Sequence, residues 1–89
     1  MTVCKYVRYT GHVQGVGFRY TTQHIAQQFA VGGYVRNLPG GDVELVAEGT
    51  PDEVDGFLAA VANRMAGYVE RTTVRDEPSG GHQGFRIRH

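Results

Sequence analysis

The apolar and polar positions of the chain recur with two different periods, and each change of period marks an expected element. Residues 3–10 are rich in Val, Tyr and Thr, which favours a strand. The sequence does not decide which face of this strand is buried, because Lys5 shares a face with apolar residues. Over 18–30 the apolar residues recur at helical spacing, with glutamines on the other side. We expect a helix there that ends at Gly32-Gly33.

The middle of the chain predicts a hairpin. Residues 34–37 and 43–48 form two short strands, and residues 38–42, with their Pro-Gly-Gly-Asp sequence, form the turn between them. Apolar residues alternate with glutamates in the second of these strands, so we expect a half-buried strand.

The remaining residues predict a second helix and two further strands. Thr50 and Pro51 suit a helix start, and Glu53 is expected to complete a capping box. Gly67 is expected to end this helix. A fourth strand follows over 68–74, and apolar residues alternate with arginines in a short last strand near the C-terminus.

The order of elements is therefore βαββαβ with a short C-terminal strand. A right-handed crossover from the first strand to the second leaves a gap, which the third strand fills as an antiparallel neighbour. We therefore expect an α+β fold, the ferredoxin-like α/β sandwich, with an antiparallel sheet of order 4-1-3-2 and both helices on one face. This fold serves many functions and does not decide the activity.

Composition narrows the class of protein. At 89 residues we expect a single domain over 1–89. Nine basic and nine acidic side chains cancel, which argues against a general nucleic-acid or membrane surface. No apolar run reaches the roughly 18 residues of a membrane span, and no signal-peptide block begins the chain. Cys4 is the only cysteine, which fits a cytoplasmic protein without an internal disulfide.

The loop over 11–19, Gly-His-Val-Gln-Gly-Val-Gly-Phe-Arg, is the strongest candidate for a site. It joins a strand to a helix, so backbone N–H groups and the helix N-terminus can hold an anion. Gly15 and Gly17 permit positive φ, and the Arg19 guanidinium matches phosphate oxygens. The loop lacks the third glycine of a dinucleotide fingerprint and the Gly-Lys-Ser/Thr of a P-loop. An ordinary turn with a surface arginine is the alternative.

Asn37 ends the second strand. Because the first and second strands run parallel in the expected fold, their C-terminal ends share one sheet edge, which brings Asn37 near the loop. Its side chain offers a donor and an acceptor and suits the holding of a water molecule. From the residues alone, a turn-starting asparagine before Pro-Gly is the alternative.

Two stretches resemble the signatures of the acylphosphatase family. Residues 11–19 are similar to the first signature, and Gly33-Tyr34-Val35-Arg36-Asn37, followed by Gly41, Val43 and Gly49, is similar to the second. The resemblance covers essentially the whole chain, including the Phe85-Arg86-Ile87 ending. It implies hydrolysis of the carboxyl-phosphate anhydride of acyl phosphates to a carboxylate and inorganic phosphate.

The resemblance also assigns residues. The phosphate-binding arginine of the family falls on Arg19 and its water-positioning asparagine on Asn37. No metal and no organic cofactor is implied. The phosphate cradle falls on the backbone amides of Gln14, Gly15, Val16, Gly17, Phe18 and Arg19. His12 lies inside the first signature at a position that the family leaves open. His24, His82 and His89 lack metal-ligand spacing, so we expect them to be solvated surface residues.

The chemistry fits this small set of groups. The leaving carboxylate has a conjugate acid of pKa about 4 to 5, so it departs without a proton and needs no general acid. Positioning and charge stabilisation then dominate the catalysis. We expect a monomer that acts on a small acyl phosphate, with inorganic phosphate as product and inhibitor, and no nucleic-acid or membrane partner.

Three alternatives remain. The first is a non-catalytic phosphate-binding or interaction module on the same fold. The second is a nucleic-acid-binding domain, which needs an RNP1-like aromatic pattern and a basic sheet, and neither is evident in the sequence. The third is a carbamoyl-phosphate role, because acylphosphatase-like domains also occur in larger hydrogenase-maturation proteins. We expect a free enzyme, since no further motif is present.

Overall fold

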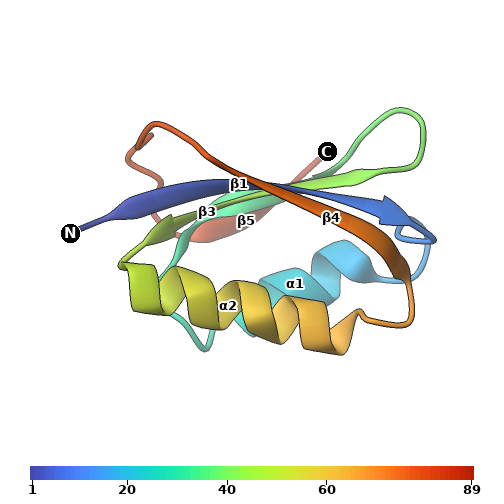
Figure 1. Cartoon of the computed structure of the whole chain (residues 1–89), viewed down its shortest axis with the longest axis horizontal. Coiled ribbons are helices and arrows are strands. Elements are labelled where there is room, and N and C mark those ends of the chain that lie inside the picture. The colour runs from blue at the N-terminus through green and yellow to red at the C-terminus, as the bar shows by residue number, and fades with distance from the viewer.

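The computed structural model describes residues 1–89 and has two layers, with both helices on one face of a five-stranded sheet (Figure 1). The elements are β1 (Val3–Gly11), α1 (Phe18–Ala26), β2 (Gly32–Asn37), β3 (Val43–Gly49), α2 (Pro51–Arg64), β4 (Val69–Asp76) and β5 (Phe85–Arg88). No helix is both long and apolar enough to cross a membrane.

The sheet order is β4-β1-β3-β2-β5, which confirms the predicted ferredoxin-like α+β fold. β3 runs antiparallel to both β1 and β2, so the C-terminal ends of β1 and β2 lie at the same edge of the sheet. β5 pairs in parallel with β2 and adds an outer strand beyond the predicted order of four. The sheet is therefore mixed rather than purely antiparallel.

The core lies between the sheet and the helices. Val7 and Tyr9 of β1 are almost fully buried there, together with Leu45 of β3 and Phe57 of α2. This identifies the buried face of β1, which the sequence left open. Lys5 belongs to the same face, but it lies near the start of the strand and forms an ion pair with Asp76.

α1 ends at Ala26, four residues before the predicted end, and the two glycines expected to stop it begin β2 instead. Both glycines allow another backbone segment to come close to the start of β2. A Cβ on Gly33, whose φ is 139°, would lie 1.8 Å from the Val46 carbonyl oxygen. A Cβ on Gly32 would lie 2.2 Å from the His82 carbonyl oxygen. These contacts are tertiary, so the local pattern did not reveal them.

α2 begins as predicted at Pro51, with the Thr50 hydroxyl accepting a 3.4 Å hydrogen bond from the Glu53 N–H. The capping box itself is wrong. The Glu53 carboxylate accepts from the Ala30 N–H at 2.6 Å and so ties the start of α2 to the segment after α1. The helix ends at Arg64 and not at Gly67.

β3 is buried on both faces, contrary to the half-buried strand that its alternation predicts. It is the central strand, and its glutamates are covered by neighbours. Glu44 accepts from the Tyr6 hydroxyl at 2.8 Å and pairs with Arg36 at 2.6 Å. Glu48 accepts from Ser79 and two N–H groups of the loop after β4, and these bonds, the Ser79 bond first, lower the pKa of its carboxyl.

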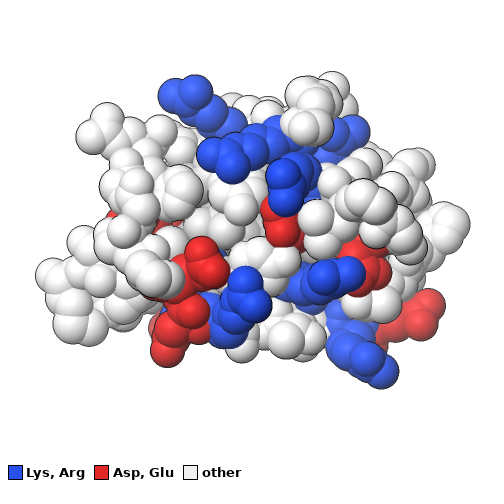
Figure 2. All heavy atoms as spheres, turned by 90° about the horizontal axis from the view of Figure 1, so that it is seen from above, with Lys and Arg blue, Asp and Glu red and all other residues white.

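The sheet face opposite the helices is rich in arginine, and Figure 2 shows basic side chains gathered on it. Strand alternation and register place these residues there: Arg8, Arg36, Arg71, Arg75, Arg86 and Arg88. A nucleic-acid-binding domain of this fold needs a basic sheet, which was not evident in the sequence but is present in the structure. Such a domain also needs aromatic rings that are free to stack on bases. Two tyrosine rings of this face are instead covered by arginines, because Arg75 lies 4.2 Å from the Tyr6 ring centroid and Arg88 lies 4.0 Å from that of Tyr34.

Candidate active site

The loop between β1 and α1 leaves the sheet at Gly11, where the pairing of β1 with β4 shifts register. Gly15 and Gly17 have φ values of 79° and 78°, in the left-handed region that favours glycine. A Cβ on either would meet nothing within 4 Å, so conformation and not space favours glycine at both positions. Gly17 is also the residue that precedes α1.

The backbone N–H groups from Gln14 to Tyr20 donate no hydrogen bond within the protein. The first helical bond runs from the Thr21 N–H to the Gly17 carbonyl oxygen, at 3.0 Å. No side chain caps α1, and its first turn contains no acidic residue. A run of free donors therefore coincides with the positive end of the helix dipole, which favours an anion.

Arg19 and Asn37 meet at one pocket of about 210 Å³. The pocket is lined by Val13, Gly15, Gly17, Phe18, Arg19, Tyr20 and Asn37. The expected meeting of Asn37 with the glycine loop at one sheet edge is therefore present in the structure. Both Arg19 and Asn37 are half-buried, and neither makes an ion pair or a hydrogen bond with a carboxylate. No acidic residue lines the pocket, so its charge is positive.

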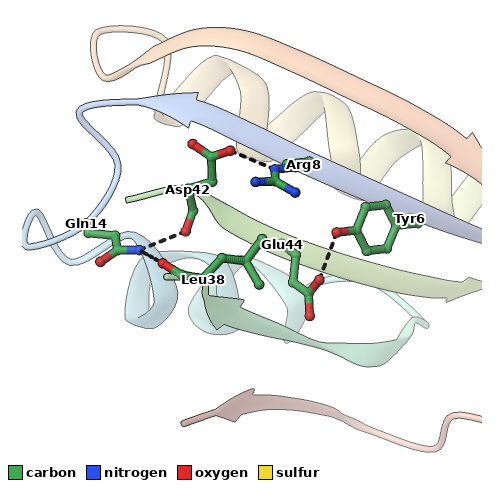
Figure 3. Close-up of polar contacts among 6 residues, drawn as sticks. All are labelled: Tyr6, Arg8, Gln14, Leu38, Asp42 and Glu44. Carbon is green, nitrogen blue, oxygen red and sulfur yellow. Dashed lines mark hydrogen bonds and ion pairs between the residues drawn. The ribbon is translucent and has the colours of Figure 1, made fainter. Parts of the chain in front are cut away.

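Two of the predicted cradle residues, Gln14 and Val16, do not line this pocket. Gln14 has a different contact, which the sequence does not predict. Its side-chain Nε2 donates to the carbonyl oxygens of Leu38 and Asp42, both at 2.8 Å (Figure 3). These carbonyls belong to the turn that follows Asn37. Gln14 therefore fixes the glycine loop to the hairpin that carries the asparagine.

The C-terminus also reaches the site. The Arg19 Nη1 lies 3.3 Å from the Nδ1 of His89, and because a guanidinium only donates, the imidazole nitrogen accepts. The parallel register of β5, with Arg36 opposite Arg88, carries the chain end to this edge of the sheet. His89 is exposed, as expected, but its contact with Arg19 was not predicted.

Tyr9 of β1 supports the glycine loop by packing against the residue at which α1 begins. Its ring packs against Phe18, the first residue of α1, with the ring centroids 5.0 Å apart. Burial raises the pKa of the Tyr9 phenol, so this side chain stays neutral under the positively charged pocket. The apolar contact fixes the start of the helix whose N–H groups face the site.

A larger pocket of about 540 Å³ lies elsewhere, on the arginine-rich face of the sheet. Tyr34, His82, Arg86 and Arg88 are among its lining residues, while Arg19 and Asn37 are not. The free backbone donors and the asparagine are together only at the smaller pocket, which is therefore the candidate active site.

Comparison with known proteins gives one consistent family. The family model described as acylphosphatase matches residues 5–87. The acylphosphatase of Methanothrix thermoacetophila is 41% identical over 88 residues, which cover 98% of each chain. That of Vibrio cholerae is 50% identical over 80 residues, 88% of each chain. The crystal structure of acylphosphatase from Bacillus subtilis superposes with a TM-score of 0.88 at 34% identity and covers 100% of both chains.

Proposed function

Because the chain belongs to the acylphosphatase family and is therefore a hydrolase of acyl phosphates, we propose that Arg19 and the glycine loop bind the phosphoryl group while Asn37 holds the attacking water. One observation carries this proposal. Arg19, Asn37 and several loop residues with free N–H groups line one pocket, and no acidic residue lines it.

The phosphoryl group is held by charge and by hydrogen bonds. Arg19 donates from a planar fork that matches two phosphoryl oxygens. The N–H groups between residues 14 and 19 donate to the same group, and the N-terminus of α1 adds its partial positive charge. These donors neutralise the equatorial oxygens, where charge is spread in the transition state.

Asn37 positions the water. Its amide makes no hydrogen bond within the protein, so its oxygen is available to accept from water and its NH₂ to donate. The water oxygen attacks phosphorus on the side opposite the acyl oxygen. The bond between phosphorus and that oxygen breaks, and its electron pair leaves with the carboxylate.

The proton balance needs no protein acid. The carboxylate leaves unprotonated, and the proton of the attacking water passes to a phosphoryl oxygen of the product. The absence of Asp, Glu and His from the pocket lining is consistent with this route. Positioning and charge stabilisation then supply the rate, and no step requires a metal or an organic cofactor.

We further propose that residues 1–89 act as one domain and as a cytoplasmic monomer. Arg19, Asn37 and the glycine loop are all supplied by one copy of the chain, so the proposed site needs no residue from a second copy. The lone Cys4 fits a reducing compartment. Inorganic phosphate is the product and, because it fits the same donors, an inhibitor.

The test separates binding from chemistry through Asn37→Ala. With EDTA present, the wild-type protein should hydrolyse benzoyl phosphate. The variant should lose at least about 100-fold in kcat, the scale for one transition-state group, while inhibition by phosphate persists. Asn63→Ala, an exposed asparagine of α2, is the matched control and should behave as wild type. A near-normal rate for Asn37→Ala would overturn the assigned role. Phosphate binding without any turnover would instead support the non-catalytic module.

A further inference from the structure

Three side chains with metal-binding donor atoms meet at the end of the sheet away from the pocket. Cys4 of β1 and Glu48 of β3 are direct partners in the antiparallel register, and they lie on the sheet face opposite the helices. His82 joins them from the loop before β5. The thiol sulfur, a carboxylate oxygen and an imidazole nitrogen all lie within 4.8 Å of one another.

The backbone of His82 holds this residue in place, and its ring lies 6.1 Å from that of Tyr34, centroid to centroid. Its N–H donates to Glu48 Oε1 at 3.2 Å, and the Gly80 N–H donates to the same oxygen at 3.1 Å. The carbonyl of His82 packs onto Gly32, where a Cβ would come within 2.2 Å of it. The loop is therefore held against the sheet, and it presents the imidazole to Cys4 and Glu48.

Burial and donor chemistry favour a particular class of ion. Cys4 is 4% exposed and Glu48 6%, whereas His82 is only half-buried, so one side of the cluster faces solvent. A sulfur, a nitrogen and an oxygen donor suit a borderline-soft ion with tetrahedral geometry, whereas Mg²⁺ and Ca²⁺ take oxygen ligands. Three protein ligands leave a fourth position for water.

We propose that Cys4, Glu48 and His82 form a binding site for a divalent transition ion of the zinc type. On binding, the Cys4 thiol loses its proton to solvent and the thiolate bonds to the ion, joined by the Glu48 carboxylate and the neutral imidazole. Metal–ligand bonds of about 2.0–2.3 Å require the donors to close by roughly 1 Å, which rotation of the three side chains can provide while the loop backbone stays in place. The hydroxyl of Ser79, which already donates to Glu48, orients that carboxylate from outside the ligand set.

This site goes beyond the hydrolysis proposed above and takes no part in it. Figure 1 shows the N-terminal end of β1 and the loop after β4 at one end of the sheet, and the glycine loop at the other. Cys4 and Gly11 are about 23 Å apart along β1. The bound ion therefore fastens the loop, and β5 after it, to the sheet without touching Arg19.

Cobalt supplies a direct readout, because Co²⁺ bonded to a thiolate gives a charge-transfer absorption. Titration of the reduced, EDTA-treated full chain with Co²⁺ should produce this band at one ion per chain, and Zn²⁺ should remove it. Zn²⁺ at about 100-fold above its Kd should raise the melting temperature by roughly 10 °C.

Variants locate the ion. Cys4→Ser should abolish the band, and His82→Ala should weaken binding at least about 10-fold. His82→Ala keeps the backbone N–H that holds Glu48, so the loop stays in place. His24→Ala, an exposed histidine of α1, is the matched control and should bind as wild type.

Two results would overturn the site: no thiolate band with the wild-type protein, or equal affinity for His82→Ala and His24→Ala. Benzoyl phosphate turnover is measured on every variant and should be unchanged. A failure of the metal site with turnover intact is therefore distinguishable from a failure of the proposed function.

Discussion

The two ends of the sheet use backbone N–H groups in opposite ways. At the edge formed by the ends of β1 and β2, the N–H groups from Gln14 to Tyr20 have no acceptor within the protein. At the other end, the N–H groups of Gly80 and His82 both donate to one carboxylate, that of Glu48. N–H groups without an internal acceptor can bind an anion, whereas N–H groups that already donate within the protein hold a loop in place.

The loops at the two ends of the sheet therefore do more than join secondary-structure elements. The glycine loop keeps its donors free only because other contacts hold it, chiefly the Gln14 side chain and the packing of Phe18 on Tyr9. The loop after β4 is held by its own N–H groups. Substitutions at the first end should therefore change catalysis, and substitutions at the second should change stability.

Arg19→Ala should give the largest effect. The variant loses the guanidinium that neutralises the charge of the phosphoryl oxygens, so kcat/KM for benzoyl phosphate should fall by at least about 100-fold. Inhibition by phosphate and the rise in melting temperature with phosphate should both be lost.

The matched control is Arg64→Ala, which removes an exposed arginine at the end of α2. Retained phosphate inhibition in Arg19→Ala would contradict the assignment of this residue as the phosphate clamp. The melting temperature without phosphate should change little, because Arg19 makes no ion pair.

Gln14→Ala should have an intermediate effect, because it removes the two hydrogen bonds that hold the glycine loop to the Leu38 and Asp42 carbonyls. We expect kcat to fall by about 10-fold. This corresponds to an increase of about 1.4 kcal/mol in the activation free energy, which is within the range for one lost hydrogen-bonded group. Steady-state kinetics on benzoyl phosphate measures it, with Gln28→Ala as the exposed control. An unchanged kcat would show that the loop keeps its position without Gln14.

Ser79→Ala should have the smallest effect and should act only on stability. It removes one of the donors to Glu48 and leaves the two N–H bonds in place. Thermal unfolding followed by circular dichroism should show a melting temperature lower by a few degrees. The kcat/KM for benzoyl phosphate should equal that of the wild type. A fall in activity without loss of stability would remove the contrast between the two ends.

Most of the fold followed from local patterns. Thr50 and Pro51 marked the start of α2, and the alternation over 43–48 marked β3. The misses have a common physical cause. Gly32 and Gly33 resembled a helix stop, but they admit the backbones of His82 and Val46. Such contacts join residues far apart in the chain, so no local pattern contains them.

For the site, the sequence singled out Arg19 and Asn37 but left an ordinary turn open for each, and their roles came from the resemblance to the acylphosphatases. The structure brings both residues to one pocket, as the argument from parallel strands expected for Asn37. The roles of Gln14 and His89 were not predictable. Gln14 depends on where the turn carbonyls of Leu38 and Asp42 point, and His89 depends on the parallel register of β5 with β2.

The position of β1 in the sheet has a consequence for how the chain folds during synthesis. β1 leaves the ribosome before the strands that it pairs with, and these partners are distant in the chain, since Val3 pairs with Gly49 and Lys5 pairs with Asp76. Closing such long loops is entropically costly and slows folding. Pairing of the first strand with β3 therefore waits until residues 43–49 have been made, and its pairing with β4 waits until residues 69–76 have been made.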